Sequence, residues 1–407
     1  MKKIQIADGI HMLTMNVEDI LFEGIWEIAN GVTLNSYIVQ GEKTAIIDGV
    51  IGWDGVPETL YKNMEEIGVA PGSIDYLIVN HMEPDHSGWI SNFRKIRDDF
   101  TIICTDKAAK MVSSFYGEDK IRVVKEGDTL DLGKGKVLSF HPVPNVHWPD
   151  TMYTHEKDTK TLFSCDMFGS FGRMGEHCFD DELTPEEKDF FEFEGIRYYS
   201  NVMATFTSSV KKAIEKAKSL EIKTIAPGHG PVYRRNPGKI MDDYSRFARY
   251  AEGAGKNEVA ILWGSMYGMT AKAVEYAEGI LQREGIKYNK LEMPLESESE
   301  MVAAVLKSAG VIIAAPTYEY KLFPPVAAAL NELGRKRITG KAAFRFGSYG
   351  WSGGAEKELY EIMERNKMNW DLIESVEFEG APGAEDLKKV EAGVLELIKK
   401  MRERVVL

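Results

Sequence analysis

Hydrophobic and polar positions divide the chain into two regions with different patterns. In the first region, short apolar or partly alternating runs are typical of strands, and helical segments are interspersed among them. The predicted strands are 7–16, 33–40, 43–49, 75–80, 101–106, 136–144, 161–169 and 223–228, and the predicted helices are 55–67, 185–199 and 206–220. This mixture predicts an α/β region, and we find no internal repeat in it.

Beyond the small and charged residues 251–258, the pattern becomes a regular alternation of strand and helix. Residues 258–264 (EVAILWG) form an apolar run, and 270–285 place apolar residues at helical spacing. Five strands alternate with helices to the end of the chain, which predicts an open parallel sheet covered on both faces. We therefore expect two domains, residues 1–252 and residues 256–407.

Composition and charge exclude several classes of protein. A chain of 407 residues is too long for one ordinary core, and a net charge of -13 argues against nucleic acid as a partner. Two N-terminal lysines lack an apolar run behind them, and no stretch is long and apolar enough for a membrane span. The three cysteines form no C-x-x-C pair, so we expect a reducing, cytoplasmic location and no built-in rubredoxin-type module.

Four side chains that can bind metal lie within six residues, directly after a predicted strand. They are His81, Glu83, Asp85 and His86 in the segment VNHMEPDHSGW. Open α/β sheets gather ligands at such strand ends, and an extended loop can turn alternate side chains inward. The alternative, a polar and solvated loop that merely contains two histidines, is disfavoured by the density of possible ligands and by the sites that follow. Three further candidates follow strand-like runs: His147 in PNVHWPDTM, Asp166 in FSCDMFG and His229 in APGHGPV.

Taken in order, these seven residues resemble the metal signature of the metallo-β-lactamase superfamily over about residues 1–250. The resemblance has one departure, since Glu83 stands where the hydrolases of that superfamily have a histidine. Neutral imidazoles suit Zn²⁺, whereas additional carboxylates suit harder ions and the higher oxidation states of iron. Four imidazoles with three carboxylates therefore favour a di-iron centre for redox chemistry over a zinc hydrolase.

Three loops in the second region suggest a flavin site. The segment ILWGSMYGMTAKA runs from strand through loop to helix, and its hydroxyls and free helical N–H groups can hold a phosphate. It is neither a Walker loop nor a dinucleotide G-x-G-x-x-G motif. The candidate loops are Ser265, Met266, Tyr267, Gly268, Met269 and Thr270; Pro316, Thr317, Tyr318, Glu319 and Tyr320; and Ser348, Tyr349, Gly350, Trp351, Ser352, Gly353 and Gly354. This layout resembles flavodoxin over about residues 256–407.

The two halves together resemble the flavodiiron protein family over nearly the whole chain. The resemblance implies a metallo-β-lactamase-like αββα domain followed by a flavodoxin-like five-stranded domain, with FMN on the three loops. It also implies a residue near the pocket, for which Tyr199 in RYYSNVM is the candidate, with Tyr198 adjacent. The implied ligand set is His81, Glu83 and His147 for one iron, Asp85, His86 and His229 for the other, and Asp166 as the bridge.

The resemblance further implies an enzyme that passes electrons from FMN to the di-iron centre and reduces O₂ to water, NO to N₂O, or both. Its electron donor would be a rubredoxin-like protein or a reduced deazaflavin coenzyme, and its assembly a head-to-tail homodimer or a dimer of dimers. Two alternatives stay open at this point. A binuclear zinc hydrolase would leave the second half without a role, and a non-catalytic electron carrier would leave the seven ligands without one.

Overall fold

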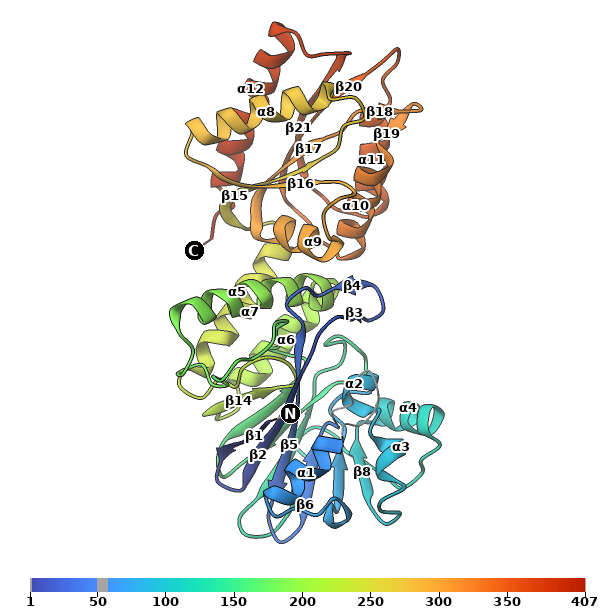
Figure 1. Cartoon of the computed structure of the whole chain (residues 1–407), viewed down its shortest axis with the longest axis vertical. Coiled ribbons are helices and arrows are strands. Elements are labelled where there is room, and N and C mark those ends of the chain that lie inside the picture. The colour runs from blue at the N-terminus through green and yellow to red at the C-terminus, as the bar shows by residue number, and fades with distance from the viewer. Residues whose placement is uncertain (1, 50–57, 407) are drawn as a thin grey trace. The chain divides into compact units, whose positions relative to one another are not determined.

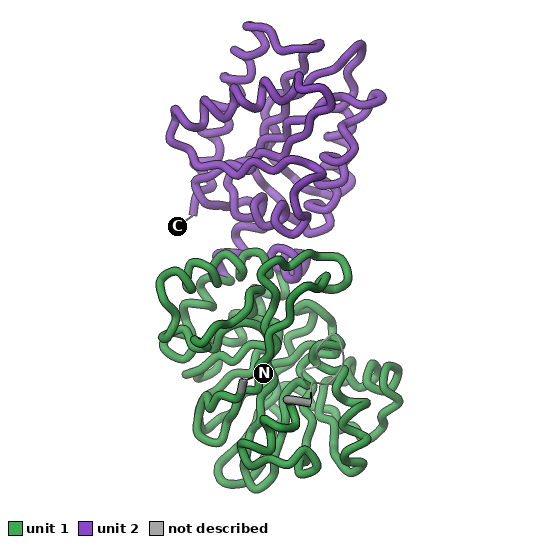
Figure 2. The backbone as a smooth tube through the Cα atoms, in the orientation of Figure 1, with its two compact units in different colours: residues 1–198, 208–244 green, residues 199–207, 245–407 purple. Residues whose placement is uncertain are grey.

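The computed structural model describes residues 2–49 and 58–406, which form two compact units. The first unit comprises residues 1–198 and 208–244, and the second comprises 199–207 and 245–407 (Figure 2). The described residues contain no helix that is both long enough and apolar enough to span a membrane.

Two β-sheets form the centre of the first unit (Figure 1). The larger has the order β1 (Lys2–Ala7), β2 (Ile10–Val17), β5 (Val32–Gln40), β6 (Thr44–Ile47), β7 (Tyr76–Ile78), β8 (Thr101–Cys104) and β9 (Ile121–Val123). The smaller has the order β10 (Thr129–Asp131), β11 (Val137–Pro142), β12 (Met152–Glu156), β13 (Thr161–Cys165) and β14 (Thr224–Pro227). A short hairpin, β3 (Leu21–Phe22) and β4 (Trp26–Glu27), stands apart from both sheets.

Apolar side chains fill the space between these sheets and the space outside them. Tyr37 and Ile47 of the larger sheet share one buried cluster with Leu138 and Phe163 of the smaller sheet. A second cluster lies between the larger sheet and its helices, and Trp89 is fully buried in it. The helices from residue 58 to residue 251, the last of which continues into the second unit, are α1 (Glu58–Glu66), α2 (Pro84–Ser87), α3 (Ile90–Phe93), α4 (Asp106–Tyr116), α5 (Pro185–Tyr198), α6 (Thr207–Lys218) and α7 (Pro237–Ala251).

The second unit is a parallel sheet with helices on its faces. Its strand order is β16 (Lys287–Glu292), β15 (Lys256–Trp263), β17 (Ser308–Ala314), β20 (Ala342–Tyr349) and β21 (Asp371–Glu379), and all neighbours are parallel. The order reverses between β15 and β17, which is where open α/β sheets bind ligands. The other elements are α8 (Met269–Arg283), α9 (Glu298–Lys307), α10 (Pro324–Arg335), α11 (Ala355–Arg365), α12 (Ala384–Arg402) and the hairpin β18 (Thr317–Tyr318) with β19 (Lys321–Leu322).

The predicted fold class is confirmed, and so is the parallel five-stranded sheet. Six strands of the first unit were not predicted, namely β1, β3, β4, β9, β10 and β12. Strand β1 begins among charged residues, and β12 (MYTHE) reads as polar although all five of its residues are buried. The helix predicted over 55–67 is observed as α1, Glu58–Glu66, and residues 55–57 lie outside the described part of the chain.

Candidate metal and flavin sites

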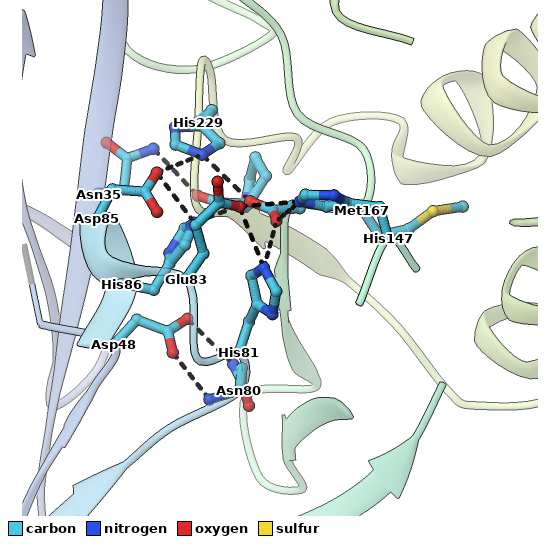
Figure 3. Close-up of polar contacts among 12 residues, drawn as sticks. Asn35, Asp48, Asn80, His81, Glu83, Asp85, His86, His147, Met167 and His229 are labelled. Carbon is cyan, nitrogen blue, oxygen red and sulfur yellow. Dashed lines mark hydrogen bonds and ion pairs between the residues drawn. The ribbon is translucent and has the colours of Figure 1, made fainter. Parts of the chain in front are cut away.

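The seven predicted metal ligands come together in the first unit, at the ends of strands from both sheets. The segment from His81 to His86 follows β7 and opens α2, whereas Asp166 follows β13 and His229 follows β14. Because β6 and β7 are parallel, and β13 and β14 are parallel, their carboxyl ends point the same way within each sheet. Figure 3 shows the histidines directed toward a group of carboxylates.

Asp166 lies at the middle of this group, and each of its oxygens faces a different pair of histidines. Oδ1 is 2.8 Å from His86 Nε2 and 3.1 Å from His229 Nε2. Oδ2 is 3.2 Å from His147 Nε2 and 3.4 Å from His81 Nε2. The carboxylate of Asp166 is therefore placed to be shared between two neighbouring ions.

The remaining two carboxylates divide in the same way. Glu83 Oε2 is 2.9 Å from His147 Nε2 and 3.3 Å from His81 Nε2. Asp85 Oδ2 is 3.4 Å from His229 Nε2 and 3.5 Å from His86 Nε2. Possible ligand atoms thus form one group of His81, Glu83, His147 and Asp166 and another of Asp85, His86 and His229, the same grouping that the family resemblance implies.

Several atoms of this cluster are buried without a hydrogen-bond partner among residues 2–49 and 58–406. They include both carboxylate oxygens of Asp85, both of Asp166, and Nε2 of His86 and His229, because the short distances among these atoms are not accompanied by the angles of a hydrogen bond. A buried acceptor without a donor is costly, and a charged one is more costly still. Lone pairs from imidazoles and carboxylates that converge in this way fit a bound cation, so the residues present suit a metal centre.

Second contacts orient the ligand side chains. His229 Nδ1 lies 3.0 Å from the carbonyl oxygen of Thr33, so Nδ1 carries the proton and Nε2 presents its lone pair to the cluster. Asp150 Oδ2 is 3.5 Å from His81 Nδ1 and accepts a hydrogen bond from the backbone N–H of Met82. Such partners fix the tautomer of a ligating histidine and adjust its basicity.

The charges in the cluster shift its pKa values strongly. Burial by itself would lower the pKa of His81, but contacts with Asp150 and Glu83 raise it to about 9. Burial by itself would also lower the pKa of His147, but contacts with Asp166 and Glu83 raise it to about 10. Although burial disfavours the charged form of Glu83, hydrogen bonds from His147 and His81 lower the pKa of its carboxyl to about 2. The cluster therefore attracts positive charge, and a proton and a metal ion compete for the same imidazole nitrogens.

Sequence reasoning missed three residues around the cluster. The first is Asp150. The other two, Asp48 and Cys165, lie with His86 in a third group of possible ligand atoms. Burial raises the pKa of Asp48 to about 6, and its carboxylate accepts a hydrogen bond from the backbone of Asn80. In the sequence, Asp48 stands within the predicted strand 43–49, and only the observed end of β6 at Ile47 places it directly after an apolar strand, as the His-rich segment is.

The structure places the two neighbouring tyrosines differently. Tyr198 ends α5 in the first unit, and its ring centroid lies 5.7 Å from that of His229. Its hydroxyl is buried and has no hydrogen-bond partner in the described part of the chain. Tyr199 belongs to the second unit, where its hydroxyl lies 3.0 Å from Thr207 Oγ1. Tyr198, the neighbour of the predicted Tyr199, thus packs its ring beside a candidate metal ligand.

The predicted phosphate loop of the second unit connects β15 to α8. Gly268 is the N-cap of α8 with φ 81°, and its N–H donates to Ser265 Oγ at 3.0 Å. The buried hydroxyl of Thr270 lies 3.0 Å from Ser348 Oγ, so this side chain joins the phosphate loop to the loop after β20. A helix N-terminus with a hydroxyl beside it is a suitable cradle for a phosphate group.

The other two predicted flavin loops lie at the same edge of the sheet. Residues 317–322 form a hairpin whose turn residues, Glu319 and Tyr320, both have positive φ. At Gly354, φ is 137° and a Cβ would lie 2.3 Å from the carbonyl oxygen of Tyr320, so only glycine lets the two loops approach so closely. Exposed aromatic side chains gather on the three loops, and these are Tyr267, Tyr318, Tyr320 and Trp351. Such a group suits a flat aromatic ligand.

The fold and the two candidate sites define the class of protein: a unit of the metallo-β-lactamase type joined to a flavodoxin-type unit. Residues 32–230 match the model of a family described as ODP family beta lactamase. A nitric oxide reductase of Moorella thermoacetica is 29% identical over 394 residues, covering 95% of this chain and 96% of that relative. An anaerobic nitric oxide reductase flavorubredoxin of Vibrio vulnificus is 31% identical over 370 residues, covering 88% of this chain and 72% of that relative.

Solved structures agree with these relatives. The rubredoxin oxygen:oxidoreductase of Desulfovibrio gigas superposes with a TM-score of 0.90 at 25% identity, covering 99% of each chain. A flavo di-iron protein variant of Thermotoga maritima superposes with a TM-score of 0.88 at 27% identity, covering 98% of each chain. The chain belongs to the flavodiiron protein family.

Proposed function

We propose that the protein is an oxidoreductase that passes electrons from FMN to a non-haem di-iron centre and reduces O₂ to water, NO to N₂O, or both. The observation that carries the proposal is Asp166, whose two oxygens each face one histidine pair. Relatives named as nitric oxide reductases and as an oxygen oxidoreductase support this reaction over the zinc hydrolase considered from the sequence.

We assign the di-iron centre to residues 1–252 and FMN to residues 256–407. His81, Glu83 and His147 would hold one iron, Asp85, His86 and His229 the other, and Asp166 would bridge them. FMN would be held by its phosphate at 265–270 and by its ring at 316–320 and 348–354. When bound, FMN accepts electron pairs and releases electrons singly, and a pair of irons binds the gas and supplies the electrons together.

The chain's own residues then prepare the site for proton-coupled reduction. Complete reduction of O₂ to water takes four electrons and four protons, and conversion of two NO molecules to N₂O takes two of each, so the pocket needs a proton source. Burial and the nearby charge of Asp166 hold the pKa of Tyr198 well above its usual value. Tyr198 therefore stays protonated, and its hydroxyl, which has no partner among the described residues, can donate a hydrogen bond beside His229.

The surroundings of the protein follow from the same proposal. We propose a cytoplasmic location, which the three buried free cysteines Cys104, Cys165 and Cys178 suit. The electron donor would be a separate rubredoxin-like protein or a reduced deazaflavin coenzyme. A head-to-tail homodimer, or a dimer of dimers, is the proposed assembly, and sedimentation at several concentrations measures it.

The reaction is tested with protein purified without oxygen and loaded with iron and FMN. The protein is reduced chemically, and O₂ or NO consumption is followed with gas electrodes while N₂O is measured in the headspace. We expect consumption of at least one gas, with loss of that activity in Asp166→Asn. Thioester hydrolysis by a zinc-loaded protein that consumes neither gas would contradict the proposal.

A further inference from the structure

Arg345 is a charged residue in the interior of the parallel sheet of the second unit. It lies on β20, a strand with neighbours on both sides, and its exposure is 0%. Phe344 and Phe346 flank it and pack in the cluster with α8 and α12, so Arg345 points to the opposite face. Strands of this kind are usually continuous apolar runs, and a buried charge needs a partner.

The contacts of Arg345 connect the two loops that we assign to the flavin ring. Its Nη2 donates to the carbonyl oxygen of Ala315 at 3.2 Å, directly before the 316–320 loop. Its Nη1 donates to Glu377 Oε1 at 2.7 Å. The other oxygen of Glu377 lies 2.7 Å from the position that a Cβ on Gly353 would occupy, beneath the 348–354 loop. Nε of Arg345 is buried and has no partner among residues 2–49 and 58–406.

The two members of this pair are not equally screened. The guanidinium is fully buried, whereas 25% of the Glu377 side chain is exposed to solvent, which weakens the field of the carboxylate. Arginine stays protonated, so the base of the two loops carries a fixed positive charge in an otherwise acidic chain. A reduced flavin carries more negative charge than an oxidised one, and nearby charges shift the balance between the two forms.

We propose that Arg345 and Glu377 are positioning residues that set the preference of the site for reduced over oxidised FMN. Arg345 favours the reduced flavin, and Glu377 opposes it. This inference rests on the proposed function, because it requires FMN at the 316–320 and 348–354 loops. It adds to that function a charge pair that sets the reduction potential of the flavin, and so the driving force for electron transfer from it.

The test compares Arg345→Met, Glu377→Gln and the double variant with the native protein. The affinity for oxidised FMN is measured by quenching of flavin fluorescence on the flavin-free protein. The midpoint potential of bound FMN is measured by titration against redox dyes. For a two-electron couple, a tenfold change in the ratio of reduced to oxidised affinity corresponds to about 29.6 mV.

We expect Arg345→Met to lower the reduced-to-oxidised affinity ratio about tenfold, a fall of about 30 mV, and Glu377→Gln to raise the potential. The double variant, which removes both charges, should return within about threefold of the native ratio, or about 14 mV. Opposite signs are the diagnostic result, because loss of a merely structural contact would disturb the loops in the same way in both single variants.

Shifts of the same sign, or potentials that stay within about 14 mV of the native value in both single variants, would overturn the inference. If Arg345→Met does not fold by circular dichroism, Glu377→Gln decides alone, and a lowered or unchanged potential overturns it. Native protein that binds no FMN would instead overturn the proposed function itself.

Discussion

Replacement of Asp166 by asparagine should remove both metals at once. Asparagine keeps the shape of the side chain and one acceptor oxygen but loses the charge that both ligand groups share. In the structure, Oδ1 of Asp166 serves His86 and His229, and Oδ2 serves His81 and His147. The substitution therefore weakens the two groups together, whereas loss of a ligand from one group weakens mainly that group.

The size of the effect follows from the number of ligands. Structural four-ligand metal sites bind with about 10–16 kcal/mol, so one ligand contributes on the order of 3 kcal/mol, or about a hundredfold to a thousandfold in affinity. Asp166 contributes to both groups, so each metal should lose roughly that factor. In His147→Ala the same loss falls mainly on the group that contains His81 and Glu83.

The assay is iron per chain after anaerobic reconstitution and desalting, with circular dichroism as a check of folding. Asp158→Asn is a matched control, because this carboxylate pairs with Lys136 at the surface of the same unit. We expect about two irons in the control, about one in His147→Ala and close to none in Asp166→Asn. If Asp166→Asn keeps one iron, or as much as the control, the shared position of Asp166 is refuted.

Three further predictions concern the surroundings of the two sites. Asp150→Asn should weaken metal binding by about 10- to 100-fold, because it loosens the orientation of His81, and calorimetry that finds native affinity would count against this role. Ser265→Ala combined with Thr270→Val should lower FMN occupancy at constant iron content, and unchanged flavin absorbance would contradict the phosphate loop. The pKa values of His81 and His147 are raised to about 9 and about 10, so each holds its proton at neutral pH and releases it as the pH rises. Metal affinity of iron-stripped protein should thus rise between about pH 6 and 8, by up to tenfold per unit for each displaced proton, and a flat profile would be the contrary result.

Local sequence pattern was sufficient for the parallel sheet of the second unit because its elements carry strong signals, whereas the αββα arrangement of the first unit came from the family resemblance. The helix at 270–285 and the apolar strands of the second half follow their periods closely, and α8 and the five parallel strands are observed. The seven candidate metal ligands, which the structure brings together, could be selected for a similar reason, since each follows a strand-like run. Their division into two groups came from the family resemblance and not from the spacing.

Residues whose role depends on contacts between distant segments could not be predicted. Asp150 reaches His81 across 69 positions, and nothing local separates it from an ordinary turn aspartate. Tyr198 and Tyr199 are adjacent on the chain, and only the change from α5 to the π-helical segment Tyr199–Met203 sends them to different surroundings. Arg345 did leave a signal, because a charge stands within an apolar strand, but its partner Glu377 lies on the next strand of the sheet.

The most direct test of the central claim is the metal and flavin content of anaerobically purified native protein, by elemental analysis and absorbance. We predict about two irons and one FMN per chain, because the seven ligands form two groups around Asp166 and three loops surround one flavin site. Two zinc ions without flavin would contradict the account and would indicate that the first unit is a hydrolase of the metallo-β-lactamase superfamily.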